Sequence, residues 1–249
     1  MKLLQDLSQT LTKMGFIPEQ NRAMRWCFHD VKVLFVPAES GYPDPELTEN
    51  AIILHEDIWQ YHKTAVINRL LALTGATKRI HGRACELKRI DAETARLFLQ
   101  DFHTGGFANS YFKYGLFYKN ELMAVGLFSK CRSFQTADHQ LYKSAELTRF
   151  ACKTGIRIIG GMDKLISAFC KEFNVLHLMT YADKEWTDGK AYYTLGFQKV
   201  ADTPPLHFLI NRQTGQRVIW KNNIPFDKDA WIPARNQGNI KLIRTKNPR

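Results

Sequence analysis

The sequence predicts an α/β protein, of α+β type, whose mixed, mainly antiparallel sheet is flanked by helices and preceded by a small α/β N-terminal domain. The 249 residues are 45% hydrophobic and 24% charged, a composition typical of a globular protein with a buried core. Hydrophobic residues recur at helical spacing in some segments and alternate in others. From residue 85 to residue 201 the predicted order β-α-β-β-β-α-β-α-β combines hairpins with crossovers, which requires a mixed sheet.

The N-terminal segment contains two predicted helices and one predicted strand. Apolar residues at helical spacing predict a helix over residues 3–14. The β-branched run VKVLFV predicts a strand over residues 31–36, and a segment with glycine and proline over residues 39–49 predicts a loop. A second helix is predicted over residues 57–73.

A longer alternation of strands and helices begins at Cys85. Asn120 stands between two strand-like runs at the spacing of an antiparallel hairpin, and Thr154 and Gly155 separate a strand from the next element. The predicted strands cover residues 85–90, 114–118, 122–129, 146–153, 176–181 and 197–201, and the predicted helices cover residues 92–102, 161–173 and 189–195.

Basic residues are concentrated at the end of the chain. The formal charge is 35 − 24 = +11, with histidines neutral. Residues 1–80 carry nine basic and nine acidic side chains, residues 81–210 carry 17 and 13, and residues 211–249 carry nine and two. The net charges are therefore 0, +4 and +7. We expect an N-terminal domain, a larger central domain and a basic C-terminal extension with these boundaries.

In the expected extension, basic side chains alternate with Trp220, Phe226 and Trp231. This mixture can contact phosphates and stack on bases. A solvated, partly disordered tail and a contact with acidic protein partners are the alternatives. Nucleic acid, with DNA favoured, is the expected partner, and the residues proposed to contact it are Arg149, Arg212, Arg217, Lys241 and Arg244.

The cysteines and the apolar runs predict a cytoplasmic location. Five cysteines without a CxxC pair indicate reduced thiols. No apolar run approaches the roughly 18–20 residues that cross a bilayer, so no membrane partner is expected. Residues 1–16 lack the continuous apolar stretch and cleavage site of a secretory signal.

Three local sequences resemble motifs of the GNAT acyltransferase superfamily, in the same order. They are the strand Glu146 to Lys153 (ELTRFACK), the turn Arg157 to Gly161 (RIIGG) and the run Tyr192 to Phe197 (YYTLGF). The resemblance implies a GNAT-type sheet, N-acyltransferase activity and acetyl-CoA or another acyl donor. It also implies that Tyr192 protonates the departing thiolate.

The same resemblance implies where the donor's pyrophosphate binds. A helix N-terminus offers unpaired amides and the positive end of the helix dipole. The residues expected to hold the donor are Arg157, Gly160, Gly161 and Lys164. Met162 stands where the superfamily has glycine or alanine, and we expect its side chain to hinder coenzyme A binding.

A narrower resemblance covers most of the chain and points to DNA. The chain is similar to the phage-associated module in the C-terminal half of Hef-like homing endonucleases and, more distantly, to Mom-type DNA modification proteins. The most specific match is Tyr-Ala-Asp over residues 181–183, followed by Gly189 and Tyr192; the others are Phe102, His103, Gly105, Glu146, Leu147, Arg149, Gly160, Gly161, Lys164 and Leu165. This similarity implies chemistry at Asp183 and Tyr192.

The residues themselves allow these roles. Asp183 directly follows a predicted strand, at the end where open α/β sheets bind ligands, and can accept a proton. Tyr192 can donate one. The alternatives are that Asp183 caps a turn and that Tyr192 packs its ring in the core. The further candidates for catalysis are Tyr181, Glu146 and His103, although His103 is equally well explained as an exposed loop residue.

The N-terminal segment resembles the end of a small Vsr-like nuclease domain. The matching residues are Leu54 to Trp59 and Arg69 to Leu71. The strand VKVLFV contains no carboxylate to hold a divalent metal, so we expect docking or DNA contact and no cleavage. His55 and His62 lack a third ligand nearby in the sequence, and no metal site is predicted.

The functional prediction is a transferase that modifies an amino group of a nucleic-acid base by general acid and base catalysis. One alternative is a non-catalytic module that binds DNA or protein, motivated by Met162. The other is an accessory protein of a phage-type nuclease, in which Asp57 would be required.

Overall fold

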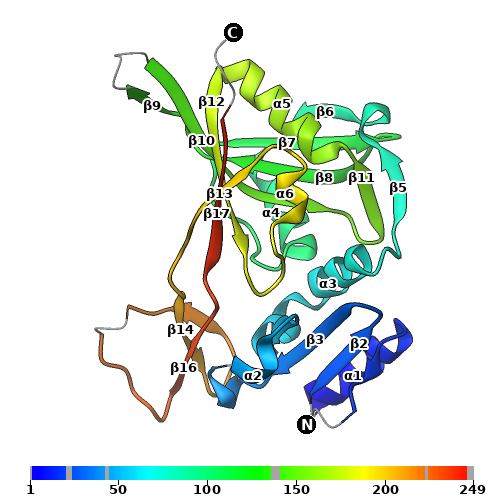
Figure 1. The fold of residues 1–249 in the computed structure, drawn as a ribbon, viewed down its shortest axis with the longest axis vertical. Helices are drawn as coiled ribbons and strands as arrows, with labels where there is room; N and C mark the ends of the chain where they lie inside the picture. Colours follow the sequence, from blue (N-terminus) through cyan, green and yellow to red (C-terminus); the bar gives the residue numbers. More distant parts are fainter. Residues whose placement is uncertain (1, 21–23, 43–44, 136–140, 222–223, 246–249) are drawn as a thin grey trace. The chain divides into compact units, whose positions relative to one another are not determined.

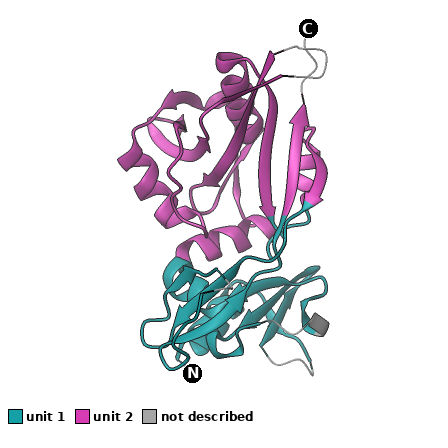
Figure 2. Cartoon of the chain, turned by 90° about the vertical axis from the view of Figure 1, so that its left-hand side faces the viewer, with its two compact units in different colours: residues 1–63, 183–188, 202–239 teal, residues 64–182, 189–201, 240–249 magenta. Residues whose placement is uncertain are grey.

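The computed structural model describes all residues except 1, 21–23, 43–44, 136–140, 222–223 and 246–249. The chain forms two compact units, each built from three segments (Figure 2). Their composition differs from the contiguous segments expected from the sequence, because residues 64–80 belong to unit 2 and residues 211–239 to unit 1. Unit 1 comprises Met1–Lys63, Asp183–Asp188 and Asp202–Asn239, and unit 2 comprises Thr64–Ala182, Gly189–Ala201 and Ile240–Arg249.

Unit 1 contains a four-stranded sheet in the order β1-β2-β3-β4 (Figure 1). Its first three strands are antiparallel, and β3 pairs with β4 in parallel. The predicted strand over residues 31–36 is confirmed, and residues 43–44 of the predicted loop lie outside the described residues. The elements are α1 (Lys2–Lys13), β1 (Ile17–Pro18), β2 (Arg25–Phe28), β3 (Val31–Val36), η1 (Ala38–Ser40), α2 (Pro45–Thr48), β4 (Ile52–His55) and α3 (Glu56–Leu73), which continues into unit 2.

A second, three-stranded sheet of unit 1 comes from the basic segment that follows residue 202. The order is β15-β14-β16, and both pairs are antiparallel. Ile210 pairs with Ile232 across the sheet and both are buried, so apolar packing folds this segment despite its charge. The strands are β14 (His207–Asn211), β15 (Arg217–Ile219) and β16 (Trp231–Arg235).

The large sheet of unit 2 is mixed, as predicted. Its order is β13-β17-β12-β10-β8-β7-β6, with β9 paired to β10. β10 and β12 are parallel, whereas β6, β7, β8 and β10 form successive antiparallel pairs. The strands are β6 (Glu86–Arg89), β7 (Phe112–Tyr118), β8 (Glu121–Phe128), β9 (Arg132–Gln135), β10 (Leu141–Cys152), β12 (Val175–Asp183), β13 (Gln198–Asp202) and β17 (Asn239–Thr245).

Helices cover both faces of this sheet, and a small parallel pair of strands lies beside it (Figure 1). The predicted hairpin between β7 and β8 is confirmed. Lys119 and Asn120 both have positive φ, as the favoured two-residue hairpin turn requires. The remaining elements of unit 2 are β5 (Lys78–His81), η2 (Gly82–Ala84), α4 (Ala92–Phe102), β11 (Ile156–Ile159), α5 (Gly161–Phe173) and α6 (Lys190–Tyr193).

The end of the basic segment is an interior strand of unit 2. β17 lies between β13 and β12, and Leu242 is fully buried. This differs from the expected extension, because Ile240 and Leu242 alternate with Lys241 and supply one apolar face.

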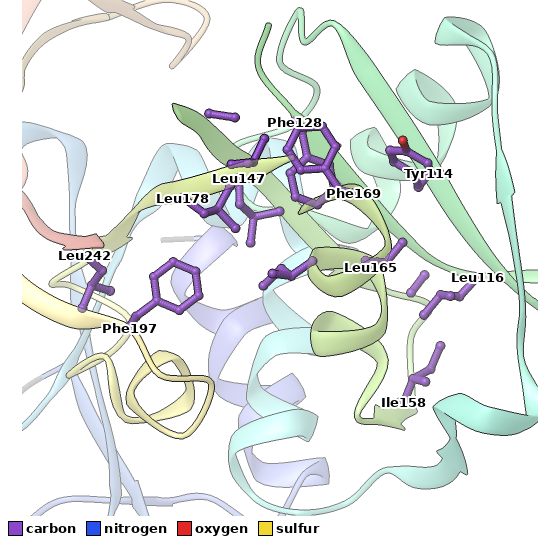
Figure 3. Close-up of a cluster of buried hydrophobic side chains, with 14 of the residues drawn as sticks. Tyr114, Leu116, Phe128, Leu147, Ile158, Leu165, Phe169, Leu178, Phe197 and Leu242 are labelled. Atoms are coloured by element: carbon purple, nitrogen blue, oxygen red, sulfur yellow. The ribbon is translucent and has the colours of Figure 1, made fainter. Parts of the chain in front are cut away.

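The main core of unit 2 lies between α5 and the large sheet (Figure 3). Phe128 of β8 and Phe169 of α5 stack with ring centroids 4.1 Å apart, and both side chains are fully buried. Leu147 and Leu178 extend this core to the parallel pair β10 and β12. The core therefore fixes α5 against the strands that form the candidate site.

Candidate active site

The parallel pair β10 and β12 separates part of the way along its length. Its pairing runs from Lys143 and Val175 to Leu147 and Thr180 and ends there. A β-bulge falls between Leu147 and Arg149 in the pairing of β10 with β8, at the same point. The Thr180 hydroxyl donates to the Leu147 carbonyl at 2.9 Å. Beyond Leu147, β10 continues to Cys152 paired with β8 and no longer with β12, so part of its backbone on the β12 side is left for another hydrogen-bonding chain. Two carbonyls of this stretch are already used, because Thr148 O accepts from Arg149 and Cys152 O accepts from the Asn68 amide at 2.7 Å.

Tyr192 of α6 lies beside this separation. A hydrogen bond links its side chain to Thr180, and its ring packs edge-on against Phe197. Burial raises the pKa of the Tyr192 hydroxyl, against the opposing effects of Arg69 and Thr180. The hydroxyl therefore keeps its proton at neutral pH and is a proton donor. The ring packs against the core, as one interpretation from the sequence expected, while the hydroxyl reaches Thr180. The role of Tyr192 as the proton donor to the thiolate stays a prediction.

Glu146 precedes the bulge on β10 and lies on the strand face opposite Leu147. Its backbone N–H donates to the Ser129 hydroxyl at 2.9 Å. Burial raises the pKa of the half-buried Glu146 carboxyl, although Arg149 and Arg132 act in the opposite direction. A carboxylate with a raised pKa is a better general base at neutral pH.

Arg149 fixes the loop that follows α4. Its Nε and Nη2 donate to the carbonyls of Gly106 and Gly105 at 3.1 and 3.3 Å, and its Nη1 donates to Thr148 O at 2.8 Å. The Gly105 N–H donates to His103 Nδ1 at 3.0 Å. The guanidinium predicted to contact nucleic acid is thus held by backbone carbonyls. His103 Nδ1 already accepts a hydrogen bond, so a neutral ring carries its proton on Nε2, which disfavours His103 as a base.

The turn before α5 leaves free space beside its first glycine. Gly160 has φ of 72°, and a Cβ added there would meet no heavy atom within 4 Å. At Gly161 an added Cβ would lie 2.7 Å from Ile158, so only glycine fits. Met162, which we expected to hinder the donor, is partly buried and packs against the core. The first-turn amides of α5 lack intrahelical partners and can bind an anion.

The basic residues near this turn are differently placed. Arg157 is exposed on β11. Lys164 Nζ donates to the carbonyls of Gly82 and Cys85 at 3.0 and 2.5 Å, which ties α5 to η2. Asp163 pairs with Arg244 at 3.0 Å, so the acidic charge at the helix N-terminus is neutralised. Backbone amides, with Arg157 alongside, therefore suit an anion here better than Lys164 does.

A cavity of about 350 Å³ lies beside α5. Of the residues predicted to act in the site, only Arg244 lines it. Its walls come from α5, β12 and β17: Ile166, Ser167, Cys170, Val175, Leu176, Leu178, Arg244 and Thr245.

Asp183 belongs to a buried charged cluster in unit 1, whereas Tyr181 and Tyr192 belong to unit 2. The Asp183 carboxylate accepts the Glu185 N–H at 2.9 Å, which is the turn-capping alternative. Glu185 in turn contacts His55 Nε2 at 3.1 Å. Burial and the nearby Glu185 carboxylate raise the pKa of Asp183 to about 6, although the Glu185 N–H, His55 and Arg217 lower it.

Asp183 is expected to make stability pH-dependent. Its folded-state pKa of about 6 lies above the ordinary 3.8, so the folded state binds the proton more tightly. The free energy of unfolding should therefore fall by roughly 3 kcal/mol as the pH rises from about 4 to about 6, and no further above that. Urea unfolding of the wild type and Asp183→Asn across this range measures the difference. A parallel pH dependence in the two proteins would refute the assignment to Asp183.

Asp57, the residue that a nuclease role would require, is also in this cluster. Arg217 donates to it from Nε and Nη2, and the Asp57 side chain is only 2% exposed. Among the residues that the structure describes, no group of three or more His, Cys, Asp or Glu could hold a metal ion. A buried carboxylate paired with arginine has a sufficient structural explanation.

The remaining predicted nucleic-acid contacts divide into two kinds. Arg217 and Arg244 are paired with Asp57 and Asp163. Arg212 is exposed, although its Nε donates to Lys228 O, and Lys241 is half-buried beside His177. Tyr181 is 39% exposed on β12. The sequence missed the role of Thr180, because nothing in the run LMTY distinguishes it from an ordinary strand residue.

No protein-family model and no curated protein matches the chain. A GNAT family acetyltransferase from Elizabethkingia anophelis with acetyl-CoA bound is 14% identical; the match covers 66% of this chain and 99% of that chain, with a TM-score of 0.41. The ribosomal-protein-S18-alanine N-acetyltransferase from Escherichia coli is 13% identical; the match covers 66% of this chain and 96% of that chain, with a TM-score of 0.43. A Bacillus subtilis acetyltransferase in complex with CoA is 12% identical; the match covers 66% of this chain and 99% of that chain, with a TM-score of 0.40. Likeness at this level does not assign a family, so the function must be argued from the site.

In the described part of the chain, no helix is both long and apolar enough to cross a membrane. None of the five cysteines forms a disulfide.

Proposed function

We propose that the protein is an N-acyltransferase that takes its acyl group from an acyl-CoA. The observation that carries the proposal is the separation of β10 from β12 at Leu147 and Thr180, next to the Tyr192 hydroxyl. The pantetheine arm of an acyl-CoA contains two amides, which can pair with the open backbone edge of β10. The first-turn amides of α5 and the open side of Gly160 suit its pyrophosphate.

The chain's own residues supply both proton transfers. Glu146 takes the proton that the acceptor amine loses as its nitrogen bonds to the acyl carbon. Tyr192 gives a proton to the thiolate sulfur as the carbon–sulfur bond breaks. Positioned proton transfers of this kind typically contribute 10²–10⁴-fold to the rate. The raised pKa of Tyr192 keeps on its hydroxyl the proton that it must give, and the raised pKa of Glu146 makes its carboxylate a stronger base.

We further propose that the acceptor is an amino group of a nucleic-acid base. The net charge of +11 favours a polyanionic substrate. The purified protein is incubated with acetyl-CoA, or longer acyl-CoAs, and single-stranded or duplex DNA, and the DNA is digested to nucleosides for mass spectrometry. We expect one nucleoside to gain the mass of the acyl group. Unchanged nucleosides with every donor would refute this acceptor, although not the acyl-CoA site itself.

A non-catalytic binding module is the second candidate. Lys164 favours it, because its ammonium group is held by the carbonyls of Gly82 and Cys85 and cannot turn toward a phosphate without losing both. Calorimetry separates the candidates. Binding of acetyl-CoA at micromolar concentration supports the transferase, and the absence of any heat at millimolar acetyl-CoA supports the module.

A further inference from the structure

The edge of the unit 2 sheet carries a ribbon that the proposed chemistry does not use. β9 and the start of β10 form an antiparallel pair that projects from the sheet (Figure 1). Phe134 is 42% exposed and Leu141 is 76% exposed, although large apolar side chains are usually buried. Phe134 lies on the same face of the ribbon as Tyr142, whereas Leu141 pairs with Gln135 and lies on the other face.

One face of this ribbon combines aromatic and basic side chains. Phe134 and Tyr142 are direct cross-strand partners, and their rings stack at 5.7 Å with 20° between their planes. The centroid of the Tyr142 ring lies 6.0 Å from that of the His177 ring on β12. Burial lowers the pKa of His177, and the nearby charge of Lys241 on β17 lowers it further. Arg132 pairs with Ser144 and therefore shares the face of Phe134. We name Arg132, Phe134, Tyr142, His177 and Lys241 the ribbon face.

The charges of the ribbon face are available to a ligand. Among the described residues, no carboxylate forms an ion pair with Arg132 or Lys241. Lys130 and Lys143, both exposed, add positive charge at its margins. Flat rings between cations match a chain of phosphates and bases, since phosphates attract the cations and bases stack on the rings.

The ribbon face leads to the proposed general base. Tyr142 and Glu146 are four residues apart on β10 and point to the same side of the strand. At about 3.3 Å per residue, this places the stacked rings roughly 13 Å from Glu146. A ligand on the rings would therefore hold the nucleotides that flank the reacting base, and the base itself would reach Glu146.

We propose that the ribbon face binds single-stranded nucleic acid and thereby presents the acceptor base to Glu146. Single strands are favoured over duplexes because unpaired bases are free to stack on Phe134 and Tyr142. The assignment to acyl transfer rests on the proposed function, whereas the binding of the strand does not depend on it.

The test measures binding of a fluorescently labelled single-stranded DNA of mixed sequence by anisotropy. The double variant Phe134→Ala/Tyr142→Ala is expected to bind about tenfold or more weakly, because stacking is lost. The double variant Arg132→Ala/Lys241→Ala is expected to lower the slope of log K against log salt by about 1.4, or 0.7 for each lost phosphate contact. The control variants are Tyr111→Ala and Lys171→Ala, whose side chains are exposed elsewhere in unit 2. They should bind as the wild type does.

Three results would overturn the proposal: unchanged affinity in both ribbon variants, equal loss in the controls, or tighter binding of the matching duplex. Displacement of the strand by an equimolar poly-glutamate peptide would also overturn it and indicate an acidic protein partner. Calorimetry with acetyl-CoA on the same ribbon variants separates the two proposals. Retained acyl-CoA binding with lost DNA binding supports the ribbon face, and DNA binding without any acyl-CoA binding refutes only the transferase.

Discussion

Replacing Tyr192 by phenylalanine is expected to lower kcat for acyl transfer by about 10²–10³-fold and to leave KM for acetyl-CoA nearly unchanged. The variant removes the proton donor, so the thiolate must leave unprotonated. The ring remains and keeps its edge-on contact with Phe197. Steady-state kinetics with release of free thiol as the readout measures the effect.

Tyr193 provides the matched control for this variant. It is the next residue on α6, is 41% exposed, and belongs to no part of the proposed chemistry. Tyr193→Phe should therefore retain the wild-type kcat. A Tyr192→Phe enzyme as active as the wild type would contradict the role of Tyr192 as general acid. An equal loss in both variants would show that α6 was disturbed as a whole.

Phe169→Ala is expected to lower the free energy of unfolding by about 3–5 kcal/mol, the usual cost of removing a buried phenylalanine ring. Phe169 is fully buried and stacks on Phe128, so its removal leaves a cavity between α5 and the sheet. α5 begins directly after Gly160, at the turn proposed to bind the pyrophosphate of acyl-CoA. Loosening α5 should therefore weaken acyl-CoA binding as well. Urea denaturation measures the first effect and calorimetry the second.

Leu97→Ala is the control for the cavity. Leu97 is 56% exposed on α4, and its removal should cost well under 1 kcal/mol. A loss below about 1 kcal/mol for Phe169→Ala would contradict the packing of α5 on the sheet.

The elements predicted correctly are those with strong local signals. The hairpin at Asn120 follows from its turn residues, and α5 follows from helical spacing after two glycines. The segment charges alone predict a basic tail for residues 239–245, which differs from the observed strand β17. The alternation of Ile240 and Leu242 with Lys241 was a visible sign of a strand.

The charged cluster of unit 1 could not be predicted. Asp57 and Arg217 are 160 residues apart in the chain, and no local pattern links them. The separation of β10 from β12 is equally hidden, because it depends on a bulge and on where Thr180 meets Leu147. Glu146 and Tyr192 could be nominated by resemblance, but their burial and the resulting pKa shifts needed the fold. The direction of the Met162 side chain also needed the fold, because it depends on how α5 packs.

Hydrogen exchange in the presence of acetyl-CoA tests the central claim most directly. Beyond Leu147, the β10 amides that face away from β8 have no strand partner on that side, and the first-turn amides of α5 have no intrahelical partner, so these amides should exchange quickly in the free protein. Saturating acetyl-CoA should slow exchange in the peptides that cover residues 148–152 and 160–164, and leave those of the β7–β8 hairpin unchanged. Unchanged exchange in both of the first two peptides would contradict an acyl-CoA site between β10, β12 and α5.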